Sequence, residues 1–318
     1  PPPAPPCVRA AGGVRGGKPI GGTEWSWSGY DLRDAEDGRQ RPEGAKAPGF
    51  EARKRFAASN VTEIHQEAVS VSYTAQGATK QVTPATGSTT VTIGRHPLPR
   101  DDLRASQSSP TGATVLPADE LAWQIGTQLK QIGRDVEKTF ITGKYAKPTD
   151  NQTPRKTRGL IEAITTNVAT TTHKASELTE ADVVDLIEKV WTNGGLQEGE
   201  TRTLIVNSTL KRALTRVFIK EAKYQESSRN VGGVNLKTIE TDFGSLNIML
   251  NRYVPATKLI VASLEQLSPV FMEIPGKGHL FAEPLAKTGA SDDVQIYGEI
   301  GLEYGNEKAH GCLTVAAG

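Results

Sequence analysis

The sequence predicts an α+β fold, and three observations support that prediction. One long amphipathic helix pattern lies in the first half, short strand patterns crowd the second half, and strands and helices do not alternate regularly. Regular strand–helix alternation would instead predict a parallel sheet. The 318 residues are enough for one or two domains with a sizeable core.

The strongest pattern is a helix over residues 117–143. Apolar side chains spaced three or four residues apart form one stripe: Leu121, Ile125, Leu129, Ile132, Val136 and Phe140. Pro117 suits the first turn and Gly143 suits the end. Because this helix is about twice the usual length, we expect it to be a spine on which other elements lie, with its stripe buried in the subunit.

The second half of the chain predicts two shorter helices and several strands. Thr179 begins one helix with Asp182 three residues later, a variant of the capping box. Its apolar face holds Val183, Leu186, Ile187, Val190 and Trp191. Ser208 is expected to cap the other helix. Strand patterns cover residues 203–206, 235–240, 245–250, 258–262, 269–273, 294–304 and 313–315.

A long hairpin is predicted over residues 61–93. Val69, Val71, Tyr73 and Ala75 alternate with polar residues, and residues 88–93 form a second strand pattern rich in Thr. Both strands carry few large apolar side chains, and a two-stranded hairpin alone is marginal in water. We therefore expect the hairpin, including Ile93 at its end, to dock on a neighbouring subunit.

The N-terminal region has two interpretations. Residues 1–22 are rich in Pro and Gly, and residues 23–60 are polar, with Trp25, Trp27 and Tyr30 at no helical or strand period. The region is either a loosely ordered tail or an arm whose aromatic side chains anchor on another surface.

Composition excludes several classes of protein. With 37 basic and 36 acidic residues the net charge is +1, so bulk charge cannot hold this chain on nucleic acid. The sequence has no apolar run of the 18 to 20 residues that cross a membrane. Two cysteines, Cys7 and Cys312, exclude a disulfide-rich scaffold and a zinc site built from cysteines.

The chemical motifs in the sequence are weak, and we predict neither an enzyme nor a cofactor. Gly12, Gly17 and Lys18 have the spacing of a phosphate-binding loop, but Pro19 follows where Ser or Thr should bind magnesium. Residues 242–244 spell the magnesium motif of kinases without the other kinase motifs, so we interpret them as a turn. The five histidines lack metal-ligand spacing.

Short segments in a fixed order give the chain a family resemblance. They are residues 23–25, 43–45, 60–64, 69–72, 120–124, 158–160, 241–244, 251–252, 285–289 and 298–303. In this order the sequence resembles the major capsid proteins of tailed bacteriophages, which share the Hong Kong 97 fold. The similarity runs from about residue 23 to the C-terminus.

The resemblance implies a shell protein with four parts. These are an N-terminal arm (1–60), an extended β-hairpin loop (61–116), a peripheral domain with the spine helix (117–157 and 265–318) and an axial domain (158–264). An arm and a hairpin without partners of their own fit this implication, because the missing partners can be copies of the same chain. The candidate subunit-interface residues are Trp25, Trp27, Tyr30, Val69, Val71, Tyr73 and Ile93.

The implied function is self-assembly, through hexamers and pentamers, into an icosahedral virion shell around double-stranded DNA, after synthesis in the host cytoplasm. Portal, scaffolding, maturation-protease and cementing proteins are the further partners that the resemblance implies, with no membrane and no metal. The alternatives are a bacterial nanocompartment shell of the encapsulin kind, a nucleotide-dependent enzyme built on residues 12–18, and a phage tail-tube protein.

Overall fold

The protein is described by a computed structural model over residues 17–30, 37–47, 49, 52, 55–77, 80–82, 91–93, 120–150, 152–197, 201–221 and 237–317. The chain divides into two compact units. Unit 1 comprises the described residues of Ile64–Val136 and Ile274–Glu299, and unit 2 those of Ala4–Glu63, Glu137–Glu273 and Ile300–Gly318. The four-part division made from the resemblance stays a prediction.

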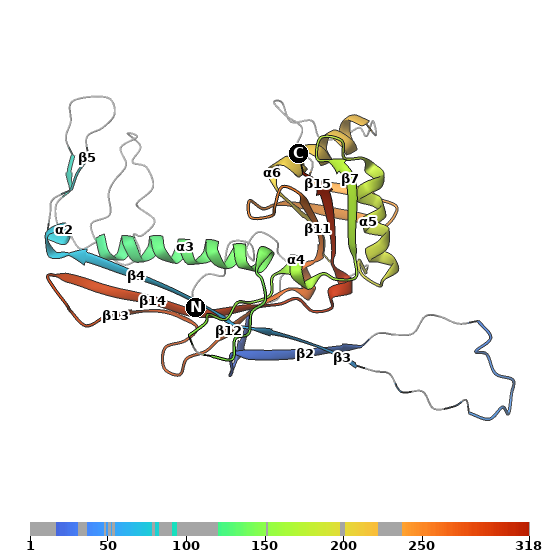
Figure 1. Ribbon diagram of the computed structural model, residues 1–318, viewed down its shortest axis with the longest axis horizontal. Coiled ribbons are helices and arrows are strands. Elements are labelled where there is room, and N and C mark those ends of the chain that lie inside the picture. Colours follow the sequence, from blue (N-terminus) through green and yellow to red (C-terminus); the bar gives the residue numbers. More distant parts are fainter. Residues whose placement is uncertain are drawn as a thin grey trace. The chain divides into compact units, whose positions relative to one another are not determined.

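Helices and strands are mixed, so the predicted α+β class is confirmed (Figure 1). The strands are β1 Lys18–Ile20, β2 Glu24–Tyr30, β3 Arg55–Val61, β4 Glu63–Ser72, β5 Lys80–Val82, β6 Val91–Ile93, β7 Val168–Lys174, β8 Arg202–Val206, β9 Thr238–Thr241, β10 Gly244–Leu250, β11 Lys258–Ser263, β12 Ser268–Met272, β13 Leu280–Pro284, β14 Ser291–Glu303 and β15 Gly311–Ala316. The helices are α2 Tyr73–Gly77, α3 Glu120–Thr142, α4 Leu160–Ala163, α5 Glu180–Thr192 and α6 Ser208–Thr215, with a π-helical segment at Arg216–Glu221 and 3₁₀ turns at Leu264–Gln266 and Glu307–Ala309.

The main core of unit 2 is built on a six-stranded sheet in the order β7-β15-β11-β8-β10-β9. Its central strand β8 is antiparallel to β11 and parallel to β10. Helix α5 packs on β15 and β7 (Figure 1). The approach is so close that a Cβ on Gly311 would lie 2.4 Å from Cγ2 of Val190. Gly311 therefore has no room for a side chain.

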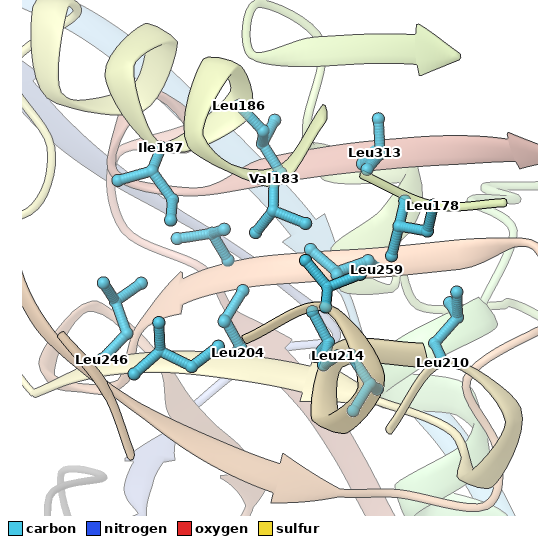
Figure 2. Packing of buried hydrophobic residues seen from close by; sticks show 14 of the residues in the cluster. Leu178, Val183, Leu186, Ile187, Leu204, Leu210, Leu214, Leu246, Leu259 and Leu313 are labelled. Atoms are coloured by element: carbon cyan, nitrogen blue, oxygen red, sulfur yellow. The ribbon is translucent and has the colours of Figure 1, made fainter. Parts of the chain in front are cut away.

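The side chains of α5, α6 and the central strands form one apolar cluster. Val183, Leu186 and Ile187 of α5 lie with Leu259 of β11 and Leu313 of β15 (Figure 2). The predicted inward positions of the α6 region, Leu210, Leu214, Val217 and Phe218, are also buried. The helical and strand periodicities thus placed most of this core correctly.

Two details of these helices differ from the prediction. Trp191 is 56% exposed rather than on the buried face of α5, because it lies about 100° around the helix from Val190, at the edge of that face. The cap of α6 is Asn207, one residue before the predicted Ser208, and its Oδ1 accepts a hydrogen bond from Leu210 N at 2.9 Å.

The predicted capping box at the start of α5 is confirmed. Oγ1 of Thr179 accepts a hydrogen bond from the backbone N–H of Asp182, and the Asp182 carboxylate accepts one from the Thr179 N–H at 2.9 Å. Nδ1 of His173 lies 2.8 Å from the same carboxylate. Burial would raise the pKa of Asp182, but hydrogen bonds from Thr179, Thr171 and His173 outweigh it and hold the pKa well below its ordinary value.

This depressed pKa predicts an acid-dependent loss of stability. A carboxylate whose pKa is lower in the folded chain stabilises the fold above its unfolded pKa of about 4, and that contribution is lost as the pH falls toward the folded value. We expect urea midpoints to drop on acidification below about pH 4, and to drop less in Asp182→Asn. An identical acid dependence in both proteins would contradict this assignment.

Strands near the N-terminus belong to unit 2, which corrects the expectation that residues 23–60 lack a strand period. β2 pairs antiparallel with β3 from Glu24↔Val61 to Tyr30↔Arg55. β1 lies parallel to β12, and β12 is antiparallel to the last residues of β14. The alternation in β2 was hard to recognise because its other residues include Ser26, Ser28 and Gly29, and Ser and Gly are poor indicators of a strand.

Asn60, at the end of β3, joins three segments of unit 2. Its side chain is fully buried, and Nδ2 donates to the Leu302 carbonyl at 2.7 Å and the Arg158 carbonyl at 3.2 Å. Its Oδ1 accepts from the Arg158 N–H at 2.8 Å and the Val61 N–H at 2.9 Å. The buried amide of Asn60 therefore makes all four of its possible hydrogen bonds within the chain, two as donor and two as acceptor.

In unit 1, β4 does not pair with Val91–Ile93, the described part of the second strand of the predicted long hairpin. It pairs with β14, which is also antiparallel to β13, and β5 pairs separately with β6. The expectation that this element lacks a third strand is wrong for β4, because its partner strand lies more than 200 residues further along the chain. Sequence alternation identified β4 as a strand but could not identify this distant partner.

The predicted strand also ends earlier than expected. Tyr73 and Ala75 belong to the short helix α2, and the Tyr73 N–H donates to the Ala290 carbonyl at 3.1 Å. Gln76 donates to Asp292 at 2.9 Å, and Lys287 forms an ion pair with Asp292 at 2.8 Å. Asp292 lies in β14.

Helix α3 confirms the predicted helix over Glu120–Thr142, and residues 117–119 lie outside the described residues. Its apolar stripe is only partly buried. Ile132, Val136 and Phe140 are buried, whereas Leu121 and Ile125 are half-buried and Leu129 is 37% exposed. The expectation that the whole stripe is core is therefore wrong for the N-terminal half of the helix.

Candidate assembly surfaces

Trp25 and Trp27 in β2 are anchored within their own chain. The Trp27 Nε1–H donates to the Gly305 carbonyl at 2.8 Å, and its ring meets Tyr304 edge-on at 4.8 Å between centroids. The Trp25 ring covers Gly301, where a Cβ would lie 2.3 Å from the indole. Both rings are half-buried. The surface on which these aromatics anchor is therefore supplied by unit 2 of the same chain.

The two tryptophans offer a matched test of one hydrogen bond. The buried Nε1 of Trp25 has no hydrogen-bond partner among the described residues, whereas that of Trp27 has one. Replacing either ring by Phe removes a similar volume, but only Trp27→Phe removes a hydrogen bond. We expect Trp27→Phe to lower the free energy of unfolding by about 1 kcal/mol more than Trp25→Phe, measured by urea denaturation. Equal losses would mean that the Gly305 contact contributes nothing.

The remaining predicted interface residues have different environments. Val69 and Val71 are buried in the subunit. Tyr73 is exposed, and its hydroxyl accepts a hydrogen bond from Lys287 Nζ at 2.8 Å. The side chains of Tyr30 and Ile93 lie outside the described part of the structure. The role of all seven residues between subunits stays a prediction, but Val69 and Val71 already have apolar surroundings in one chain.

Seven large apolar side chains that were not among the candidate interface residues are exposed in the described part of the chain. In unit 1 they are Ile64, Trp123, Leu129 and Leu285, and in unit 2 they are Val168, Trp191 and Leu250. Trp123 is 46% exposed and lies off the apolar stripe of α3. Its position off the stripe is the feature of the sequence that could have indicated its exposure. Trp191 lies 5.9 Å from Phe243 between ring centroids, and Phe243 is partly buried against the main core of unit 2.

The weak chemical motifs are structural. Lys18 lies in strand β1, and it forms an ion pair with Glu303 at 2.5 Å. The lysine of a phosphate-binding loop instead stands where the loop opens a helix, so the structure does not support that interpretation of residues 12–18. Gly12 lies outside the described residues. Residues 242–244 make the predicted tight turn between β9 and β10, with Gly244 at φ +103°.

The described residues hold no group of three or more His, Cys, Asp or Glu side chains that could bind a metal ion. Among the described helices, none is long and apolar enough to span a membrane. The one described cysteine, Cys312, is buried, and burial raises the pKa of its thiol. The described surface exposes large apolar and aromatic side chains.

The family model of the SU10 major capsid protein matches residues 2–317. The chain belongs to this family. No curated protein sequence matches it significantly. The predicted function, a structural major capsid protein of a bacteriophage shell, is confirmed at this level.

Solved structures show the fold of this major capsid protein. The capsid of a native gene transfer agent (GTA) particle matches with a TM-score of 0.57 at 11% identity, covering 98% of this chain and 90% of that one. The mature capsid of bacteriophage PhiM1 matches with a TM-score of 0.52 at 10% identity, covering 96% and 85%. The predicted Hong Kong 97-like capsid fold is confirmed by these similarities.

An encapsulin has a similar fold. The SrpI encapsulin complex of Synechococcus elongatus PCC 7942 matches with a TM-score of 0.53 at 11% identity, covering 96% of this chain and 86% of that one. At such identities the likeness shows the fold alone, so similarity of fold does not distinguish a phage capsid from a nanocompartment. The family match over nearly the whole chain separates them.

Proposed function

We propose that copies of this capsid protein assemble into a closed icosahedral shell that encloses double-stranded DNA. The observation that carries this proposal is the family match over residues 2–317. The role is structural, and the proposal includes no catalytic activity. Portal, scaffolding, maturation-protease and cementing proteins are the further partners we propose, with the virion as the final location and the host cytoplasm as the place of assembly.

Exposed apolar side chains on α3 support contacts between copies. Trp123 and Leu129 expose large apolar surface on a helix whose apolar stripe is buried only in its C-terminal half. Burying apolar surface stabilises an interface by about 25 cal/mol per Å² before ordering costs. Aromatic side chains are enriched in the centres of such interfaces. We include Trp123 and Leu129 with the seven residues selected from the sequence.

The charge balance supports close packing of like subunits. With a net charge of +1 on 318 residues, copies repel one another weakly. The same balance means that bulk charge does not hold the enclosed DNA on the shell. Any contact with the DNA is proposed to be without sequence specificity.

The contents of the particles test the proposed function. Particles purified from the natural source are treated with nuclease, and the protected nucleic acid is extracted and sized. We expect long double-stranded DNA that survives nuclease until the shell is opened. Particles of the same shell filled with a single protein, without protected DNA, would overturn the proposal in favour of a nanocompartment, the function favoured by the encapsulin likeness.

Substitutions on α3 test the proposed contact surface. Leu129→Ser removes exposed apolar area, and Lys130→Ser changes an exposed neighbour of comparable length as the control. We expect Leu129→Ser to keep the circular dichroism of the wild type but to raise the protein concentration needed for shell formation, measured by light scattering. Equal assembly thresholds in the two variants would remove Leu129 from the interface.

A further inference from the structure

Unit 2 contains a cavity beside the main core. It has a volume of about 60 Å³ and lies where the end of α3 meets α4, β8, β10, β12 and β14. Its walls include Phe140, Ile141, Leu160, Ile205, Leu302 and Met249. All of these except Met249 are buried, and Met249 is half-buried, so its side chain borders both the cavity and the outside.

The lining gives water few partners. A buried water needs two to four polar groups, whereas this lining is almost wholly apolar. The polar atoms of Asn251, which also lines the cavity, are already bonded elsewhere. Its Nδ2–H donates to Glu137 at 2.7 Å, and its Oδ1 accepts from the Tyr253 N–H at 2.8 Å. The site is partly open, but so apolar a lining offers water few hydrogen bonds, and a small apolar ligand would give its walls the van der Waals partners that they lack.

The size of the cavity limits its ligand. One water needs about 10–15 Å³, and an engineered apolar cavity of about 150 Å³ in another protein holds benzene or xenon. With about 60 Å³, this cavity is large enough for a single heavy atom or a very short hydrocarbon and too small for an aromatic ring in its present shape. We propose that it is a binding site for a compact apolar ligand of about the size of xenon, and that occupancy stabilises the subunit.

The chain carries its own reporter for this site. It has two methionines, of which Met249 lines the cavity and Met272 does not. Protein labelled with ¹³C at the methionine methyl groups therefore gives one signal at the site and one internal control. Met272→Leu assigns the two signals, because it removes only the control.

The first experiment adds xenon gas to the labelled protein, with helium at the same pressure as the reference. Helium has the weaker dispersion attraction, so it controls for pressure. We expect the Met249 methyl signal to shift in a saturable manner and the Met272 signal to stay in place. If the Met249 signal does not move, or if both signals move alike, the site does not exist as proposed.

The second experiment measures stability under the same gases. Binding to the folded state alone raises the folding equilibrium constant by about tenfold when the free ligand is at ten times its dissociation constant. We expect that gain under xenon in the wild type and in Met272→Phe, and its loss in Met249→Phe, whose bulkier side chain takes the place of Met249 and part of the cavity beside it. A gain that persists in Met249→Phe would overturn the proposal. Should that variant fail to fold, the methyl shift of the wild type still decides the question.

Discussion

Asn60→Leu is expected to lower the free energy of unfolding by about 3–5 kcal/mol, which is close to abolishing the folded subunit. Asn60 is fully buried. Its Oδ1 accepts hydrogen bonds from the Arg158 N–H and the Val61 N–H, and its Nδ2 donates one to the Leu302 carbonyl. Leucine has nearly the same volume but leaves these backbone groups without their partner. Each unsatisfied buried group costs about 1–3 kcal/mol.

The matched control for this substitution is Asn247→Leu, because Asn247 is exposed on β10. Urea denaturation of both variants should show a large loss only for Asn60→Leu. If both variants lose the same small amount of stability, Asn60 does not join the segments of unit 2 in the way its contacts indicate.

Val136→Asp is expected to prevent soluble folding, whereas Ile125→Asp is expected to leave a folded subunit. Val136 is 1% exposed, and an unpaired carboxylate at that position would be removed from water at a cost of several kcal/mol. Ile125 belongs to the same apolar stripe of α3 but is half-buried, so a carboxylate there keeps part of its hydration. The sequence alone predicted that both positions are core.

Soluble yield and far-ultraviolet circular dichroism compare the two variants. Val136→Asp should appear in the insoluble fraction, and Ile125→Asp should be soluble with the helix content of the wild type. Soluble, helical Val136→Asp protein would show that this part of the stripe is not core. Insoluble Ile125→Asp protein would restore the view that the whole stripe is buried.

Local patterns predicted the elements whose causes are local. The capping box of Thr179 and Asp182 begins α5 as expected, because both partners lie within one turn. The alternation of Val294, Ile296, Ile300, Leu302 and Tyr304 predicted one buried strand face, and all five side chains are buried. The strand itself starts at Ser291, three residues before the predicted start.

Distant partners were not predictable in this way. β4 pairs with β14, and nothing in the alternation around Val69 points to a strand more than 200 residues away. The anchoring of Trp27 on Gly305 also joins distant positions, which are separated by 278 in the sequence. Sequence therefore found the aromatic side chains of the arm but could not show that their own chain supplies the surface beneath them.

The candidate interface was the least predictable part. Val69 and Ile64 lie on opposite faces of β4, as strand alternation indicates, but the sequence could not show that the face of Val69 is already buried within its own chain. Trp123 was not selected from the sequence because it lies off the apolar stripe of α3, and a single exposed apolar residue is not by itself a sign of an interface.

The measurement that tests the central claim most directly is the mass and form of the purified protein. Light scattering after size exclusion, followed by electron microscopy of the same fractions, determines whether the chain assembles. We expect capsomers or closed shells of uniform diameter at micromolar concentration. A monodisperse monomer of 34.1 kDa at every concentration, fully folded and without particles, would contradict the account.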